Sequence, residues 1–142
     1  MEYRLSNLEA SKIFAEDLAK QLLVSKEDTT LLFYAGMGCG KTTLIRELGY
    51  ALGIQGKITS PTFVGMNEYH LDHLDFFHYD LYQVGIAFED FAEILESAKH
   101  KIICIEWAEQ IDQSIMLLIE KNTKVMKIRI DLDDETRIVQ VD

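Results

Sequence analysis

A glycine-rich segment carries the clearest chemical signal in the sequence. Residues 35–42 read Ala-Gly-Met-Gly-Cys-Gly-Lys-Thr, which satisfies the phosphate-binding pattern Ala/Gly-x-x-x-x-Gly-Lys-Ser/Thr. Glycines let successive backbone N–H groups converge on phosphates, and the positive end of a following helix adds to their field. In such a loop the amine of Lys41 reaches the β- and γ-phosphate oxygens, and the hydroxyl of Thr42 binds Mg²⁺. The segment therefore predicts a site for ATP and Mg²⁺.

The alternative is a glycine-rich turn that happens to precede a lysine. The context favours the phosphate loop, because residues 29–34 form an uncharged run typical of a buried strand and residues 41–52 have apolar side chains at helical spacing. A strand before the loop and a helix after it form the arrangement that this motif requires. Cys39 is interpreted as a small side chain at a variable position, and the alternative is a thiol whose pKa is lowered by the helix terminus.

Two acidic residues are candidates to complete such a site. A phosphate loop needs a second carboxylate directed at Mg²⁺, usually at the carboxyl end of a neighbouring apolar strand, and Glu106 ends the apolar run 101–106. The alternative role for Glu106 is to cap the next helix. Asp80 follows residues 76–79 and could orient water or hold a metal-bound water, or it could be a turn residue that ends a strand.

Other polar clusters are better explained by exposure to solvent. His70 and His73 lie three residues apart, but no cysteine or close third histidine joins them, so a solvated loop is favoured over a metal site. The acidic residues of segment 131–135 indicate a hairpin tip rather than a calcium loop, which would need a longer ligand pattern. The acidic residues of segment 88–98 are expected to form the solvent face of a helix.

The elements that must position these residues alternate between strands and helices. We expect helices from near Asn7 to the polar loop at Ser25, over 41–52 and over 88–98, and strands over 29–34, 63–70, 75–82, 101–106, 124–131 and 136–141. Ser6-Asn7-Leu8-Glu9 has the pattern of a capping box, and the face that the first helix buries is expected to include Leu8, Ile13, Phe14, Leu18 and Leu22. Gly53 stands where a left-handed helix cap is needed. The order predicts an α/β three-layer sandwich with a mostly parallel sheet and antiparallel additions.

The bulk composition limits the classes of function. The chain has 142 residues, of which 48% are hydrophobic, enough for one core, so a single domain over residues 1–142 is expected. A formal net charge of −10 disfavours direct binding of nucleic acid or anionic membranes. Cys104 lies in an apolar run, where a buried reduced thiol is expected, and the sequence shows no leader and no apolar run long enough for a membrane span. A cytoplasmic location is expected.

Four separate segments occur in the order and spacing of one family. They are Gly38-Cys39-Gly40-Lys41-Thr42-Thr43, Thr59-Ser60-Pro61-Thr62-Phe63, His78-Tyr79-Asp80-Leu81-Tyr82 and Ile105-Glu106-Trp107. The chain therefore resembles the TsaE (formerly YjeE) family over nearly its whole length. That family comprises bacterial ATPases with a P-loop NTPase-like fold that are needed to make threonylcarbamoyladenosine next to the anticodon of certain tRNAs. The resemblance implies an ATPase that acts on a complex of the TsaD and TsaB proteins rather than on tRNA itself.

The resemblance also implies roles for single residues. Thr42 and Glu106 would act on Mg²⁺, Asp80 would be needed for hydrolysis together with Lys41 and Glu106, and segment 59–62 would be a mobile switch near the γ-phosphate. The residues implied in binding ATP are Ser11, Gly36, Met37, Gly38, Cys39, Gly40, Lys41, Thr42 and Thr43.

Three positions depart from the pattern of the family. Ala35 replaces the first loop glycine, and Ala108 stands where proline is common. Gln83 follows Asp-Leu-Tyr where arginine is typical, so a positive charge is missing that could act near phosphate or at a partner surface.

Two other functions compete with the ATPase. A small-molecule P-loop kinase could share the loop and the Mg²⁺ ligands, but phosphoryl transfer normally requires cationic clamps, and no arginine occurs from residue 47 to 128. Folding could still bring Arg129 or Arg137 of the terminal strands near the loop. A nucleotide-dependent binding module with incidental hydrolysis is the second alternative. The shortage of arginine predicts slow hydrolysis by this chain alone and faster hydrolysis with its partners.

Overall fold

The computed structural model describes residues 1–35 and 40–142, which form a seven-stranded sheet in the order β1-β7-β6-β2-β5-β4-β3. The strands are β1 (Glu2–Leu5), β2 (Thr29–Tyr34), β3 (Met66–His70), β4 (Asp75–Asp80), β5 (Lys101–Glu106), β6 (Lys124–Asp133) and β7 (Thr136–Val141). The helices are α1 (Leu8–Ser25), α2 (Lys41–Leu52), α3 (Phe88–Glu96) and α4 (Gln113–Asn122), with a 3-10 turn η1 (Ala108–Gln110).

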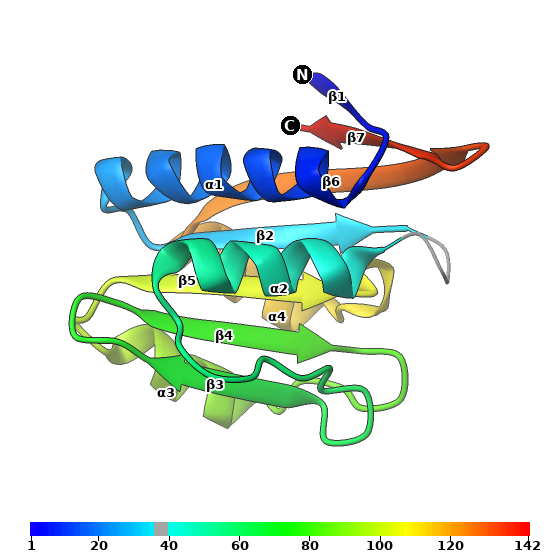
Figure 1. The fold of residues 1–142 in the computed structure, drawn as a ribbon. Helices are drawn as coiled ribbons and strands as arrows, with labels where there is room; N and C mark the ends of the chain where they lie inside the picture. The colour runs from blue at the N-terminus through cyan, green and yellow to red at the C-terminus, as the bar shows by residue number, and fades with distance from the viewer. Residues whose placement is uncertain (36–39) are drawn as a thin grey trace.

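The centre of the sheet is parallel and its edges are antiparallel. β2 runs parallel to both β5 and β6, and β4 runs parallel to β5. β3 pairs antiparallel with β4, and β7 pairs antiparallel with β6 and β1. The carboxyl ends of β2, β5 and β4 consequently meet at one edge of the sheet, where α2 begins (Figure 1). Open α/β sheets bind their ligands at this edge.

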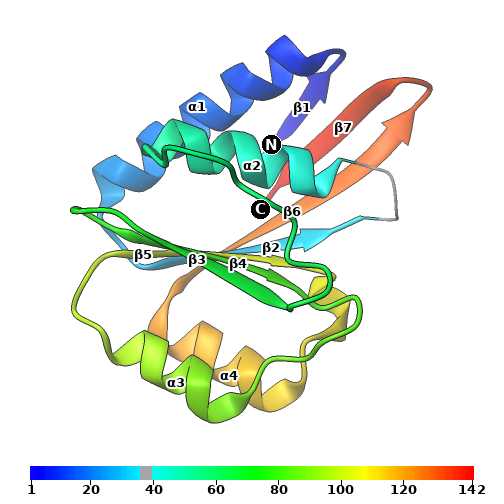
Figure 2. The same ribbon diagram turned by 60° about the horizontal axis from the view of Figure 1, so that its bottom comes forward.

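Helices cover both faces of the sheet. α1 and α2 lie on one face and α3 and α4 on the other (Figure 2). Alternate side chains of β2 point to opposite faces of the sheet. Leu31 and Phe33 belong to the core under α1 and α2, and Leu32 belongs to the core under α3 and α4. The three-layer α/β architecture predicted from the sequence is confirmed. No helix in the described ranges has the length and apolar character needed to cross a bilayer.

Helix α1 begins where the sequence predicted, but with a different cap and a different buried face. The cap is Asn7, not Ser6, because Asn7 has extended backbone angles and its side-chain oxygen accepts from the N–H of Ala10 at 2.8 Å. Leu8 and Ile13 are more than half exposed, contrary to the prediction. The buried stripe consists of Ser11, Phe14, Ala15, Leu18, Ala19 and Leu22. Its small residues allow α1 to lie close to α2.

The strands around Asp80 are shorter than predicted, and two elements were not predicted. Residues 63–65 form a turn, in which the carbonyl of Pro61 accepts from the N–H groups of Val64 and Gly65, so β3 starts only at Met66. β4 ends at Asp80, and α3 ends at Glu96. The two elements that were not predicted from the sequence are β1 and α4. The cap of Gly53 is confirmed, with a φ of 114°.

Candidate functional site

The predicted phosphate loop joins β2 to α2, and the structure describes its two ends. Gly40 precedes α2 with a φ of 86°, a left-handed conformation that glycine adopts without steric cost. Lys41, Thr42 and Thr43 form the first turn of α2. Gly36, Met37, Gly38 and Cys39, which were also predicted to contact nucleotide, lie outside the described residues.

Thr42 and Glu106 are brought together across 64 residues of sequence. The Thr42 hydroxyl donates to Oε1 of Glu106 at 2.9 Å. This contact forms because β5 is the parallel neighbour of β2, so the end of β5 lies beside the start of α2. The N-cap residue of η1 is Trp107, and no side chain makes a capping hydrogen bond there, so the alternative role of Glu106 as a helix cap is wrong.

The second oxygen of Glu106 contacts His78, a residue of the family segment 78–82 for which no role was predicted from the sequence. Nε2 of His78 lies 2.5 Å from Oε2 of Glu106, and both side chains are buried. A signal was available in the sequence. His78 is two residues before Asp80 in a strand, so both side chains must point to the same face of the sheet.

Asp80 is buried and both of its oxygens accept hydrogen bonds. Oδ2 accepts from the hydroxyl of Thr62 at 2.8 Å, and Oδ1 accepts from the N–H of Tyr82 at 3.0 Å. A side-chain oxygen that accepts from the N–H two residues later is typical of an aspartate in a turn, so Asp80 does act as the turn residue that ends β4. The first bond ties Asp80 to the segment that was expected to act as a switch. Asp80 also pairs with Glu106 in the register of β4 and β5.

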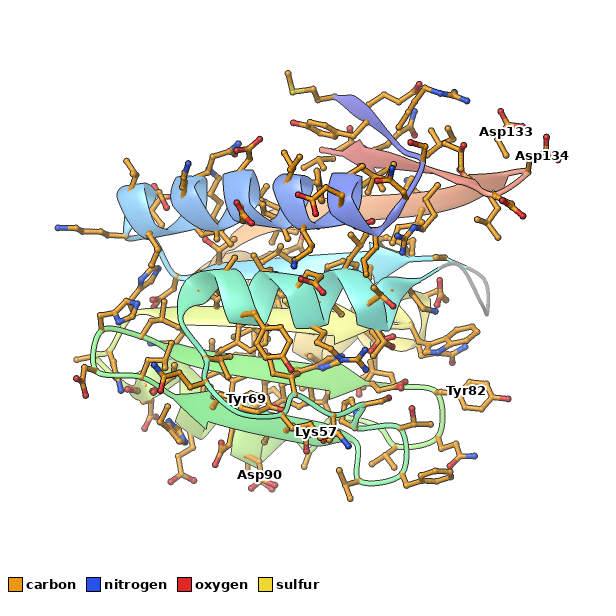
Figure 3. All side chains as sticks on the ribbon, in the orientation of Figure 1. Lys57, Tyr69, Tyr82, Asp90, Asp133 and Asp134 are labelled. Carbon is orange, nitrogen blue, oxygen red and sulfur yellow. The ribbon has the colours of Figure 1, made fainter. Side chains whose placement is uncertain are left out.

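Lys41 is held between a carbonyl and an aromatic ring. Its Nζ donates to the carbonyl of Ala35 at 3.0 Å and lies 3.9 Å from the centroid of the Trp107 ring. Trp107 itself has a φ of 59° and lies 5.2 Å from the ring of Tyr82, which projects outward (Figure 3). The ammonium group is therefore placed beside the loop and beside the end of β5.

A basic residue from β7 reaches the same loop. Arg137 donates to the hydroxyl of the buried Ser11, and a Cβ at Gly40 would overlap the Arg137 guanidinium. A hollow of about 270 Å³ adjoins these residues, lined by Leu5, Ser6, Asn7, Leu8, Gly40, Leu132, Glu135 and Arg137. Folding thus brings one terminal-strand arginine to the loop, as the sequence analysis had left open.

The segment before Thr62 is attached to α2 at one residue. Arg46 donates through Nε to the carbonyl of Ile58 at 3.2 Å, and the Ile58 N–H donates to the hydroxyl of Tyr50 at 3.2 Å. The Ile58 side chain is buried as well. Beyond this anchor Phe63 is 85% exposed. Arg46 therefore faces segment 58–62 and not the start of α2.

Of the remaining polar clusters, His70 and His73 lie at the opposite edge of the sheet, whereas the acidic hairpin tip lies at the same edge, where Glu135 lines the hollow beside Arg137. Nδ1 of His70 lies 2.7 Å from Oδ1 of Asp75, and His73 is exposed in the loop after β3. Asp133 and Asp134 are exposed at the tip of the β6–β7 hairpin, as predicted (Figure 3).

Cys104 is a buried free thiol, also as predicted, and burial raises its pKa well above the ordinary value.

The sequence of this chain is similar to proteins of one family. The family model described as "Threonylcarbamoyl adenosine biosynthesis protein TsaE" matches residues 5–139 of this chain. A protein of Synechocystis sp. named tRNA threonylcarbamoyladenosine biosynthesis protein TsaE is 33% identical over 118 residues, which are 80% of this chain and 73% of the relative. A Rickettsia bellii protein of the same name is 33% identical over 140 residues, which are 96% of this chain and 91% of the relative.

A solved structure supports the fold. The crystal structure of Bacillus subtilis YdiB matches with a TM-score of 0.68 and 22% identity, covering 98% of this chain and 82% of that chain. At this identity the likeness shows the fold alone. The P-loop NTPase-like fold class predicted from the sequence is confirmed.

Proposed function

Since the chain belongs to the TsaE family of threonylcarbamoyl adenosine biosynthesis proteins, we propose that it binds ATP with Mg²⁺ and hydrolyses it during this tRNA modification. The contact between Thr42 and Glu106 is the observation that carries the proposal. It joins a hydroxyl at the start of the loop helix to a carboxylate at the end of the neighbouring strand. A phosphate loop that works with Mg²⁺ needs these two groups in this arrangement.

The residues present fit a divalent cation. Mg²⁺ prefers oxygen ligands and is usually held by one or two protein groups, with phosphates and water completing its shell. Thr42 and Glu106 offer a hydroxyl and a carboxylate oxygen 2.9 Å apart. No group of three or more histidine, cysteine, aspartate or glutamate residues within 1–35 and 40–142 is placed to hold a metal, so the cation would depend on nucleotide phosphates. When bound, Mg²⁺ would neutralise charge on the phosphates.

The side chains suggest a division of labour. Lys41 would leave the carbonyl of Ala35 and the ring of Trp107 to contact the β- and γ-phosphates. Asp80 would orient the attacking water once Thr62 releases its Oδ2. Both steps require only local movement at residues that already meet at the carboxyl edge of the sheet.

The hollow at Arg137 is suited to the nucleoside. β5, which carries Glu106, lies on one side of β2, whereas β6 and β7 lie on the other side. A nucleotide with its γ-phosphate at Thr42 and Glu106 would therefore extend toward Gly40, Ser11 and Arg137. These residues would contact the α-phosphate, ribose or base.

The placement of the arginines supports slow hydrolysis by the chain alone. Arg4 pairs with Asp133, Arg46 binds the carbonyl of Ile58, and Arg129 lies over the ring of Tyr34. Arg137 donates to Ser11 and lies against Gly40, on the side of β2 that faces away from Glu106. An arginine at the transferred phosphoryl group accelerates related enzymes by about 10³ to 10⁵. Partner proteins of the TsaD and TsaB type would supply that cation or order segment 59–63.

Binding and turnover measurements test this function. Titration calorimetry should show that the protein binds Mg-ATP and that Lys41→Ala abolishes this binding. Glu106→Ala should reduce the increase in ATP affinity that Mg²⁺ causes, and should have a smaller effect on ATP affinity measured without metal. Glu109→Ala, which changes an exposed acid three residues from Glu106, is the matched control. Wild-type affinity in the Lys41 variant would show that the loop does not bind phosphate.

Turnover separates the proposed function from its rivals. Hydrolysis by the isolated protein should be slow and should increase when TsaD and TsaB are added. Hydrolysis alone at about 10 s⁻¹, a typical enzyme rate, and unchanged by partners would favour the kinase. Binding of ATP without turnover under any condition would favour a nucleotide-dependent binding module.

A further inference from the structure

His78 is a buried polar residue whose side chain has one polar contact among residues 1–35 and 40–142, with Glu106. Its side chain is 1% exposed, and Nε2 lies 2.5 Å from Oε2 of Glu106. Its other ring nitrogen, Nδ1, is buried and has no hydrogen-bond partner within the described residues. A buried polar atom without a partner is unfavourable, so packing alone does not account for a histidine at this position.

The two oxygens of Glu106 are held by two different elements. Oε1 accepts from Thr42 at the start of α2, and Oε2 faces His78 in the middle of β4. The terminal torsion of a glutamate is broad, so one hydrogen bond leaves the carboxylate plane free to turn. Two bonds, one to each oxygen, restrict that rotation.

Thr42 and His78 would have different roles once Mg²⁺ and nucleotide are bound. In the proposed function the Thr42 oxygen binds a cation, and its proton must then point away from Glu106. His78 would then be the remaining donor that keeps the carboxylate aligned. Since Glu106 accepts, the proton of a neutral ring must lie on Nε2, which leaves Nδ1 as the atom without a partner.

We propose that His78 is a positioning residue, which orients the Glu106 carboxylate toward Thr42 and so sets the affinity for Mg²⁺ in the nucleotide complex. The inference rests on the proposed function, since it assumes that Thr42 and Glu106 act on Mg²⁺. Residues that hydrogen-bond to metal ligands typically change metal affinity by about 10- to 100-fold when they are replaced. His78 belongs to this class by its contact, although it touches neither phosphate nor cation.

Two substitutions separate the hydrogen bond from the packing. The amide nitrogen of glutamine takes the place of imidazole Nε2, whereas that of asparagine takes the place of Nδ1. His78→Gln can therefore still donate to Glu106, and His78→Asn cannot. Cys104→Ala is the packing control, because Cys104 is the register partner of His78 and is equally buried.

The measurement is the dissociation constant of a fluorescent ATP analogue across a series of Mg²⁺ concentrations and in EDTA. We expect His78→Asn to need about 10- to 100-fold more Mg²⁺ for half-maximal binding, with an unchanged constant in EDTA. His78→Gln should stay close to the wild type, and Cys104→Ala should lower thermal stability without moving the Mg²⁺ profile.

The outcomes distinguish the inference from the function on which it rests. If the wild type bound the ATP analogue with the same dissociation constant at every Mg²⁺ concentration, both the proposed function and the role of His78 would be overturned. A Mg²⁺-dependent wild type with a folded His78→Asn that has the same profile would overturn the positioning role alone, as would a folded His78→Gln that is as impaired as His78→Asn.

A measurement on the wild type keeps the inference testable if the Asn variant does not fold. The ¹⁵N NMR signals of His78 should show the proton on Nε2 both before and after Mg-ADP is added. A proton on Nδ1 in the complex would overturn the proposed contact.

Discussion

The ammonium group of Lys41 lies 3.9 Å from the centroid of the Trp107 indole ring. The same group donates to the carbonyl of Ala35 at 3.0 Å, so both contacts would have to change for Lys41 to contact a phosphate as proposed. A cation over an aromatic face contributes about 0.5–2 kcal/mol, depending on its desolvation. In the proposed function, nucleotide binding would therefore compete with a modest interaction within the protein.

The first prediction is that Mg-ATP changes the fluorescence of Trp107, because the ring loses its cation. The chain has one tryptophan, so the signal has one source. The control is Lys41→Ala, which should show no change on addition of Mg-ATP, whereas Lys121→Ala, an exposed lysine of α4, should respond like the wild type. An unchanged spectrum at saturating Mg-ATP in the wild type would mean that the ring does not respond to the site.

The second prediction concerns Asp80. Asp80→Ala should keep ATP bound and slow hydrolysis by about 10²- to 10⁴-fold, the usual contribution of a residue that acts on the attacking water. Single-turnover hydrolysis with partner proteins measures the rate, and a separate binding titration measures ATP affinity. The control is Asp90→Ala, which removes an exposed acid on α3. Loss of ATP binding as severe as in Lys41→Ala would contradict this role.

The third prediction concerns the approach of Arg137 to Gly40. Gly40→Ala should lower both stability and nucleotide affinity, because a Cβ there would overlap the guanidinium and a φ of 86° is strained for alanine. The matched control is Gly56→Ala, since Gly56 has a φ of 87° but open space around it. That control should cost only the backbone term of about 1–2 kcal/mol.

Urea unfolding and a binding titration measure both effects. Arg137→Ala in the Gly40→Ala background should restore part of the lost stability, because it removes the overlapping group. Equal stability of the two alanine variants, with wild-type nucleotide affinity, would show that Arg137 does not lie against the loop.

The fourth prediction is a pH dependence of stability at the β3–β4 hairpin. The hydrogen bond to Asp75 raises the pKa of His70 above its ordinary value, with a further contribution from Glu68. A raised histidine pKa stabilises the folded state fully below the ordinary value of about 6.5, and this stabilisation is lost as pH rises through the folded-state pKa. Burial opposes ionisation of Asp75, but hydrogen bonds to His70 and Lys99 outweigh it and lower its pKa. Its contribution is present above the ordinary pKa and lost as pH falls through the lowered one.

Urea unfolding of His70→Gln across this range measures the effect. The variant should lose less than about 1 kcal/mol at mildly acidic pH, since the histidine is half exposed, and nothing at alkaline pH. His73→Gln, an exposed histidine of the same hairpin, should leave the profile unchanged. A uniform loss at every pH would point to packing instead of charge.

The bounds of an element could be predicted from the sequence where the residues of that segment alone define it. β2, α2 and β5 have the predicted bounds, because uninterrupted apolar runs and a loop motif define them without reference to the rest of the chain. α4 had a local signal that was missed, since Asp112 caps it by accepting from the N–H of Ile115 at 3.0 Å. β1 has four residues, too few for a periodicity.

The contacts of the site were less accessible from sequence. The strand pattern could have placed His78 on the face of Asp80, but its contact with Glu106 depends on the pairing of β4 with β5. Arg137 reaches Ser11 across 126 residues, and no feature of either segment indicates that contact. The roles of Lys41, Thr42, Asp80 and Glu106 in binding or hydrolysis remain predictions.

The pairing of β1 with β7 has a consequence for biosynthesis. Glu2 lies opposite Gln140, so this edge of the sheet cannot form until the last strand has left the ribosome. β2 and its neighbour β5 can associate earlier, since all their residues are made first. The half of the proposed site at Glu106 can therefore form before the half at Arg137, and a nucleotide could be enclosed from both sides only after β7 has been made.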